Sequence, residues 1–292
     1  MYKCVSCYKY YTTSQRQCPH CGYIVEKIDG FHAYAPPLQD KINFSVSAFN
    51  KLAEFESKNF WFISRNKLIV FMLNKYIPDM YSFMEVGCGT GFVLSGIAEN
   101  FPGVKLTGCD AFTQGLAFAK TRVPHASLLQ IDAKNIPFYD EFDAIGAFDV
   151  LEHIEDDFRV ITEIYGALHK GGLFIATVPQ HMRLWSMEDE RACHVRRYVS
   201  GELENKIVEV GFRILETTSF VTLLLPIMWL SRKIMQRFYV NNQNDDAESM
   251  REFSISPCLN SIFGWTLSVE RFGIKCGFRY PCGGSRLVVA QK

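Results

Sequence analysis

Residues 82–91 read Ser-Phe-Met-Glu-Val-Gly-Cys-Gly-Thr-Gly, a short apolar run that ends in glycines at alternate positions. A second apolar segment, with helical spacing, begins at Phe92. The stretch is typical of a strand, a glycine turn and the start of a helix. Glycine is needed where φ is positive or where a ligand lies against bare backbone, and helix N-termini offer free N–H groups to anions. The sequence predicts a ligand-binding turn here, although an ordinary tight turn would use the same residues.

The spacing of the glycines separates two kinds of nucleotide site. A dinucleotide-binding turn has the pattern G-x-G-x-x-G, whereas this chain has G-x-G-x-G with an acid two residues before the first glycine. This pattern resembles the first motif of the class I S-adenosylmethionine (SAM)-dependent methyltransferases. The resemblance implies that SAM is bound by the following residues: Glu85, Gly87, Cys88, Gly89, Thr90 and Gly91.

Length and composition limit the class of protein. The 292 residues suggest one large domain or two unequal ones. Lys+Arg and Asp+Glu both number 31, and this neutral balance argues against a nucleic-acid substrate. No apolar run approaches the ~20 residues of a membrane span, and the N-terminus shows no secretory pattern. We therefore expect a cytoplasmic protein whose ten cysteines are reduced.

Residues 1–23 contain two C-x-x-C pairs, formed by Cys4, Cys7, Cys18 and Cys21. Each pair can place two thiolates on one side of a tight turn, and two such turns complete a tetrahedral metal site. We predict a structural zinc ribbon without an open coordination position, in which His20 is not a ligand. Iron in the same site, a disulfide framework and a catalytic dithiol are the alternatives.

The segment between the ribbon and the glycine turn is predicted to contain a linker and two helices. Residues 24–45 have mixed polarity and a Pro-Pro pair, and residues 46–81 have helical apolar spacing. The run Phe60-Trp61-Phe62 with Arg65 resembles the lid that many small-molecule methyltransferases place over the cofactor. The resemblance implies that Arg65 pairs with the methionyl carboxylate of SAM, and a solvated helix arginine is the alternative.

Strands and helices alternate from residue 83 to residue 179, which predicts an α/β, doubly wound (Rossmann-like) sheet. Asp110 and Ala111 follow the second strand, and an acid at this place binds ribose hydroxyls in dinucleotide folds. The resemblance assigns Asp110 the same role with SAM, whereas a helix N-cap is the alternative. It also implies that Asp132 and Ala133, after the third strand, contact the adenine.

Candidate residues for methyl transfer follow the fourth and fifth strands. Similar methyltransferases have Asp-x-Leu-x-His at the methyl-transfer face, matched here by Asp149, Leu151 and His153. A histidine suits proton transfer near neutral pH, so His153 and His181 are the predicted catalytic residues. Further substrate candidates are Gln180, Trp185 and the run His194-Val195-Arg196-Arg197-Tyr198, which resembles a motif of ubiquinone-biosynthesis-like methyltransferases. Either arginine could hold an acidic acceptor or pair with the acids at 188–190.

The last two strands, at 212–220 and 285–291, are expected to pair antiparallel and complete a seven-stranded sheet. Residues 221–284 between them should be a substrate-side insertion, because the segment is far longer than a hairpin loop. Residues 220–239 are apolar with basic positions, so they could contact a membrane surface or pack internally.

The sequence thus predicts a zinc ribbon (1–23), a linker (24–45) and a SAM-dependent methyltransferase domain (46–292). The expected acceptor is a small molecule, a glycan or a lipid-linked compound. Two other functions stay open: an RNA methyltransferase that uses the ribbon to bind RNA, and a SAM-binding scaffold without turnover.

Overall fold

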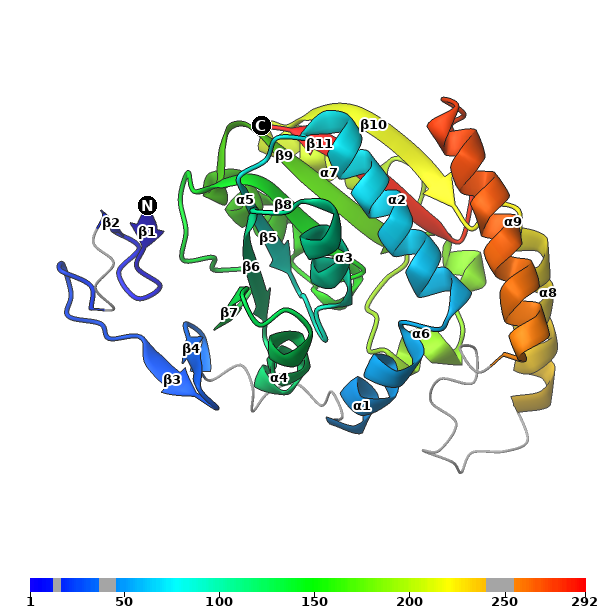
Figure 1. Cartoon of the computed structure of the whole chain (residues 1–292), viewed down its shortest axis with the longest axis horizontal. Coiled ribbons are helices and arrows are strands. Elements are labelled where there is room, and N and C mark those ends of the chain that lie inside the picture. Colours follow the sequence, from blue (N-terminus) through cyan, green and yellow to red (C-terminus); the bar gives the residue numbers. More distant parts are fainter. Residues whose placement is uncertain (13–16, 37–45, 240–254) are drawn as a thin grey trace.

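The computed structural model describes residues 1–12, 17–36, 46–239 and 255–292, and its centre is a nine-stranded sheet (Figure 1). The strand order is β10-β11-β9-β8-β5-β6-β7-β4-β3. The strands are β3 (Glu26–Ile28), β4 (Phe31–Ala33), β5 (Ser82–Val86), β6 (Lys105–Asp110), β7 (Ser127–Gln130), β8 (Phe142–Phe148), β9 (Leu168–Pro179), β10 (Arg213–Phe220) and β11 (Ser285–Gln291).

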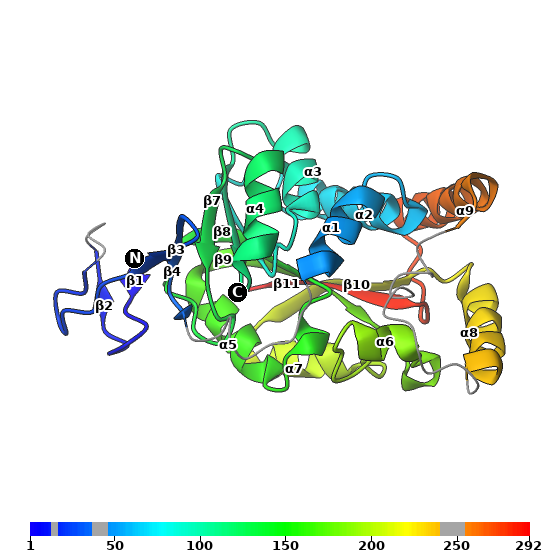
Figure 2. The ribbon, with the colours of Figure 1, turned by 90° about the horizontal axis from the view of Figure 1, so that it is seen from below.

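Helices cover both faces of this sheet, as Figure 2 shows. One face carries α1 (Val46–Phe55), α2 (Phe60–Tyr76), α3 (Phe92–Asn100), α4 (Thr113–Arg122) and α9 (Pro257–Lys275). The other carries α5 (Asp157–Ala167), α6 (Met187–Arg191) and α7 (Glu202–Val210), with α8 (Leu225–Tyr239) at the end of the molecule that also holds α9. Buried apolar side chains form two large clusters, one centred on α2 and α3 and one on α5 and α7. The predicted doubly wound architecture is confirmed.

The core of the sheet has the predicted topology. Strands β5 to β9 run parallel, and β11 pairs antiparallel with both β9 and β10. Strand β5 lies between β6 and β8, so strand order reverses beside it. Ligands of doubly wound sheets bind at this reversal, outside the carboxyl ends of the strands. The glycine turn after β5 therefore occupies the expected ligand position.

The prediction of a linker at 24–45 is wrong for residues 26–33, and residues 37–45 lie outside the described residues. The hairpin β3–β4 adds two strands to the predicted seven, because β4 pairs parallel with the edge strand β7. The buried side chain of Gln130 strengthens this junction by accepting from the N–H of Ala35 (2.9 Å) and donating to its carbonyl oxygen (2.7 Å). An uncovered edge strand would present unpaired backbone groups, and the hairpin satisfies them.

The first residues form a small two-stranded sheet, β1 (Tyr2–Lys3) and β2 (Tyr10–Tyr11), which contacts the core directly. The N–H of Lys3 donates to the carbonyl oxygen of Pro137 (3.1 Å), and its ammonium forms a buried ion pair with Glu163. The ring of Tyr2 packs on that of Phe138 at 5.7 Å between centroids. A backbone hydrogen bond, a buried ion pair and a contact between aromatic rings thus attach the ribbon to the core.

Two helix boundaries are set by local backbone structure. Helix α5 ends at Ala167, and β9 begins at Leu168, because Leu168 pairs with Phe142 in β8. Helix α7 begins after Gly201, whose φ of 80° lies in the left-handed region.

The predicted insertion contains α8 and α9. Helix α9 begins at Pro257, with the Ser256 hydroxyl accepting from the N–H of Leu259 (3.4 Å). Its buried side chains, Leu267 and Ile274 among them, belong to the same apolar cluster as α2. Leu259, near the start of the helix, is exposed. Within the described residues, no helix is both long and apolar enough to cross a membrane.

Candidate active site

The turn after β5 has the backbone that its glycines predict. Gly87, Gly89 and Gly91 have φ values of 69°, 49° and 75°, in the left-handed region. A Cβ on Gly87 would lie 2.4 Å from Val150 Cγ2, and one on Gly91 would lie 2.9 Å from Ala119 Cβ. A Cβ on Gly89 would meet no atom within 4 Å. Gly87 and Gly91 are therefore needed for packing, whereas Gly89 faces open space beside the turn.

Asp110 holds this turn against the end of β6. Its Oδ2 accepts from the N–H of Gly89 (2.8 Å) and its Oδ1 from the N–H of Phe112 (2.9 Å). Burial raises the pKa of Asp110, and the bonds from these two N–H groups oppose that rise. Asp110 is thus a buried acceptor next to Gly89, and it does not cap α4 through a side-chain bond. Its binding of the SAM ribose stays a prediction.

Glu85 lies beneath the turn, at the carboxyl end of β5. Its carboxylate is buried, and its Oε2 has no hydrogen-bond partner among the described residues. Burial raises the pKa of Glu85 well above its usual value, and the positive charge of Arg65 opposes this. A cationic ligand at this position would offset the cost of burying the carboxylate.

Arg65 of α2 points into the site from the lid side. Its guanidinium forms an ion pair with Asp149, whose Oδ2 also accepts from the Thr177 hydroxyl (3.1 Å). The indole of Trp61 covers the guanidinium, 4.5 Å from ring centroid to Cζ. Arg65 is 8% exposed, so the alternative of a solvated arginine is wrong. Its pairing with the SAM carboxylate stays a prediction.

The predicted adenine contacts follow β7. The carboxylate of Asp132 accepts from the N–H of Lys134 (2.9 Å), and its carbonyl oxygen accepts from the N–H of Asn135 (2.8 Å). This tight turn leaves Asp132 and Ala133 half-buried at the same sheet edge as Asp110, whose carbonyl oxygen accepts from the N–H of Ile131 (3.0 Å). The structure therefore brings these predicted residues together.

Two supporting residues of the turn were not predicted. Glu56, which follows α1, is buried and accepts from the Thr90 hydroxyl (2.5 Å) and from Arg122 (2.7 Å). Arg122 also donates to the carbonyl oxygen of Thr90 (3.1 Å). This network connects the lid, the turn and α4. Glu56 and Arg122 are far from the turn in the sequence and belong to no motif, so only the fold reveals them.

His153 lies in a short turn after β8, with Leu151 buried beneath it. The neighbouring ring is that of His194, 4.7 Å away between centroids, and not that of His181. His153 is exposed on one side, while the chain packed around the rest of the ring and the nearby ring of His194 both disfavour a positive charge on it. Together they lower the pKa of His153 to about 4, so the ring is neutral at pH 7.

Glu152 completes a cluster with these two histidines. It is fully buried, and neither carboxylate oxygen has a hydrogen-bond partner among the described residues. Burial and nearby Asp149 raise its pKa well above the usual value. One ligand atom each from Glu152, His153 and His194 lie within 4.8 Å of one another, a set that could hold a divalent metal ion.

The run 194–198 is fixed by acids beneath it. Asp189 accepts from His194 Nδ1 (2.9 Å) and Arg197 Nε (2.7 Å). Burial alone would raise the pKa of Asp189, but His194 and Arg197 outweigh it and hold the pKa well below its usual range. Arg196 pairs with Asp157 at 2.8 Å. Of the two alternatives for Arg197, the structure shows the pairing with the 188–190 segment.

The remaining substrate candidates line the same region. Gln180 is buried, and its side-chain oxygen accepts from the Ser219 hydroxyl (2.7 Å). His181 has φ 64°, and burial together with nearby Arg197 lowers its pKa. Trp185 Nε1 donates to Glu190 (3.3 Å). His181 and Trp185 thus lie beside the 194–198 run, and their roles stay predictions.

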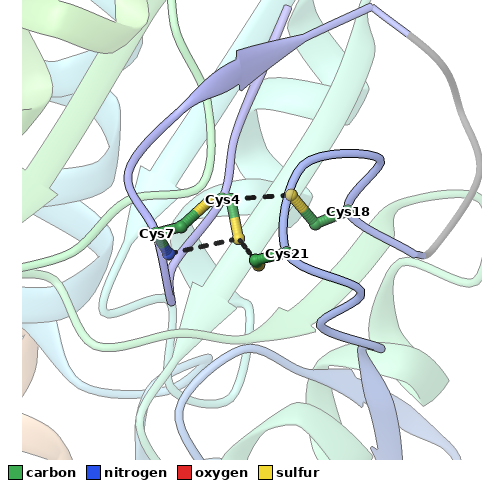
Figure 3. A group of neighbouring side chains, drawn as sticks. All are labelled: Cys4, Cys7, Cys18 and Cys21. Carbon is green, nitrogen blue, oxygen red and sulfur yellow. Dashed lines mark hydrogen bonds between the residues drawn. The ribbon is translucent and has the colours of Figure 1, made fainter.

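The four ribbon cysteines form one cluster, drawn in Figure 3. The Sγ atoms of Cys4 and Cys21 are 3.7 Å apart, as are those of Cys7 and Cys18. Four thiolates at ~2.3 Å from a tetrahedral zinc ion have S–S separations of about 3.8 Å, so the spacing fits. All ten cysteines are free. His20 Nε2 contacts the carbonyl oxygen of Tyr10 (3.2 Å) and lies outside the cluster, as predicted.

Comparisons with known proteins agree with this geometry. Residues 84–176 match the family described as "Methyltransferase domain". A Mycolicibacterium smegmatis protein named "Probable S-adenosylmethionine-dependent methyltransferase" is 24% identical over 163 residues, covering 55% of this chain and 62% of that protein. The fatty-acid O-methyltransferase of the same organism is 37% identical over 98 residues, covering 32% of this chain and 35% of that protein. The chain thus spans about three fifths or less of these relatives.

A solved structure shows the same fold. Phosphoethanolamine N-methyltransferase 2 from Haemonchus contortus, in complex with SAM, has a TM-score of 0.56 and 18% identity, and the match covers 88% of this chain and 59% of that one. The glycine motif, the sheet topology and the family match agree with one another. The chain therefore carries a class I SAM-dependent methyltransferase domain.

Proposed function

We propose that this protein transfers the methyl group of SAM to a small-molecule, glycan or lipid-linked acceptor. The observation that carries the proposal is the open glycine turn held by Asp110 and placed over the buried carboxylate of Glu85. A SAM-binding scaffold without turnover would need the same turn, so turnover is tested separately below.

The residues present fit SAM. The unpartnered Oε2 of Glu85 suits the cationic part of this ligand, and the open side of Gly89 leaves room for backbone contact. In this proposal Asp110 accepts from the ribose hydroxyls, and Asp132 and Ala133 contact the adenine through a carboxylate and backbone groups. Arg65 would bind the methionyl carboxylate if its pairing with Asp149 gave way.

SAM supplies an electrophilic methyl group, whose C–S bond breaks as a nucleophilic atom of the acceptor attacks in line. The protein must hold the acceptor in line and accept a proton when the attacking atom is a hydroxyl or an amine. His153 is neutral near pH 7 and would accept that proton on a ring nitrogen, and its neighbour His194 is held by Asp189. His181 would then position the acceptor at the end of β9.

The acceptor class rests on composition and on the relatives. The chain has no net charge, which does not favour an RNA substrate. The fatty-acid O-methyltransferase of Mycolicibacterium smegmatis acts on a fatty acid, as its name states. Most of residues 220–239 form α8. Contact of this segment with a membrane would bring a lipid-linked acceptor to the site.

We also propose that the four-cysteine cluster binds zinc as a structural ion, since its sulfur spacing suits a tetrahedral site with no open position. Four thiolate ligands must stay reduced, which supports a cytoplasmic location.

The test uses the full-length protein. Calorimetry with SAM measures binding, and incubation with methyl-labelled SAM and a cell extract measures turnover. Label in an organic-soluble or small-molecule fraction is the expected result. Label in RNA would contradict the proposed acceptor, and SAM binding with no transferred label would favour the scaffold.

A further inference from the structure

Helix α9 has an apolar stripe on its outer side as well as its inner one. The outer stripe consists of side chains three or four positions apart, all exposed: Leu259, Ile262, Trp265, Val269 and Phe272. Trp265 is 70% exposed and Phe272 67%. At 1.5 Å per residue, the outer stripe is ~20 Å long. Single exposed apolar residues are ordinary, but a continuous row of five marks a binding surface.

Helix α8 repeats the pattern at the same end of the molecule (Figures 1 and 2). Ile227, Leu230 and Ile234, at helical spacing, are about half exposed, and Trp229 beside them is 46% exposed. The ammonium of Lys233 lies 5.3 Å from the Trp229 ring centroid. A tryptophan beside a lysine suits the boundary between lipid chains and headgroups, where the ring is buried and the ammonium stays in the polar layer.

The described segments that contain α8 and α9 carry a net positive charge, although the whole chain is neutral. Residues 223–234 and 255–280 contain five cations and one acid, Glu270. Glu270 is 1% exposed, and its carboxylate accepts from the N–H groups of Thr222 and Leu223. The exposed charges of these described segments are therefore those of lysines and arginines, such as Lys233 and Lys275. A symmetric pair of copies would bring these like charges together, whereas anionic lipid headgroups complement them.

Both helices are connected to residues around the candidate site. The Asn260 side chain accepts from the N–H of Phe60 (2.9 Å) and donates to the carbonyl oxygen of Lys58 (2.9 Å), where α2 begins. Arg232 of α8 donates to the carbonyl oxygen of Leu184 and lies 3.6 Å from Asp189. Helix α9 is thus linked directly to the start of α2, and α8 is linked to the segment 184–189 beside the substrate candidates.

We propose that α8 and α9 together dock the protein on a membrane surface rich in anionic lipids, with the outer stripe in the interface. Amphipathic helices that lie in the interface use an apolar row flanked by basic residues, as here. The docking does not depend on methyl transfer. If the acceptor is lipid-linked, it would enter the site from the docked side.

The test is flotation of the full-length, metal-loaded protein with two kinds of vesicle, phosphatidylcholine alone and phosphatidylcholine with 30% phosphatidylglycerol (about one third anionic lipid). We expect binding to the anionic vesicles, weakened at high salt. The variant W265S/F272S should bind at least tenfold less, and K233E/K275E should lose the preference for anionic vesicles. The matched controls F158S/V208S and K120E/K170E change exposed residues on other helices and on β9, and should bind like the wild type.

Thermal unfolding of each variant shows whether a loss of vesicle binding comes from a folding defect. SAM calorimetry of the same variants tests the methyl-donor site independently of vesicle binding. Equal flotation of W265S/F272S and the wild type would overturn the proposal, as would equal binding to both kinds of vesicle. If the wild type did not float with vesicles but formed a dimer in solution, and W265S/F272S were a monomer, the surface would be assigned to a second copy of the chain instead.

Discussion

The N–H of Gly89 donates to the carboxylate of Asp110 across 2.8 Å, joining the glycine turn after β5 to the acid that ends β6. The two residues are 21 positions apart, and their contact fixes the turn at the point where strand order reverses. The acid is buried and its pKa is raised, so a charged carboxylate is kept here at some cost to stability. Such a cost is typical of binding sites.

Replacing Asp110 by alanine should weaken SAM binding. Charge-assisted hydrogen bonds contribute about 1.5–3 kcal/mol, so the affinity should fall roughly 10- to 100-fold. Calorimetry of the full-length variant measures this. The control Asp79→Ala removes an exposed acid outside the site and should leave the affinity unchanged. Equal affinities for wild type and Asp110→Ala would rule out the ribose-binding role.

Asp110→Asn should behave differently in the free protein. Because burial raises the carboxyl pKa in the fold, the ionised group opposes folding above the pKa of the unfolded chain, and this penalty grows until the pH passes the folded pKa. The amide side chain of Asp110→Asn lacks that penalty. The melting temperature of the variant minus that of the wild type should therefore be larger at pH 8 than at pH 4. A difference that is independent of pH would contradict the assignment.

SAM affinity should depend on pH through Glu85. Its raised pKa means that protons compete with a cationic ligand, so binding should weaken as pH falls from 8 to 5. Glu85→Gln should bind more weakly at pH 8 and show a flatter dependence. Titrations at four pH values in one ionic strength provide the measurement. A wild-type affinity that rises on acidification would show that Glu85 does not face the cation.

Cys18→Ser should remove the metal from the ribbon. Three remaining thiolates bind zinc far more weakly, and the ribbon folds with its ion. Metal analysis should fall from about one zinc per chain to near zero. Because Lys3 and Tyr2 pack on Glu163 and Phe138, the loss should also lower the melting temperature of the whole chain. The exposed Cys276→Ser serves as control, and stoichiometric zinc in Cys18→Ser would refute the four-cysteine site.

Much of the fold follows from local patterns. The glycines at 87, 89 and 91 and the strand ends at Asp110 and Asp132 are each specified by residues close in sequence, so spacing alone predicts them. The hairpin β3–β4 could not be predicted in this way. Its three-residue strands are stable only because β7 offers an open edge, a partner about 100 residues away.

The interaction partners of individual side chains could not be predicted from the sequence either. Nothing near Arg65 indicates that it pairs with Asp149, 84 positions later. Likewise His194 is adjacent to His153 because Val195 donates its N–H to the carbonyl oxygen of Glu152 (2.8 Å), which brings the 192–198 segment over the turn. Such contacts depend on how loops cross the sheet edge, and loop courses have no periodic signal.

His153→Asn provides the test of proton transfer. If the ring accepts the acceptor's proton, kcat should fall by about 10²–10⁴ while SAM affinity changes less than twofold. Since the pKa of His153 is about 4, the wild-type rate should be flat between pH 6 and 8 and fall only in acid, as the ring becomes protonated. The matched variant His125→Asn, on an exposed loop, should keep the wild-type kcat. An inflection in the pH profile that disappears in His181→Asn would instead assign the base to His181.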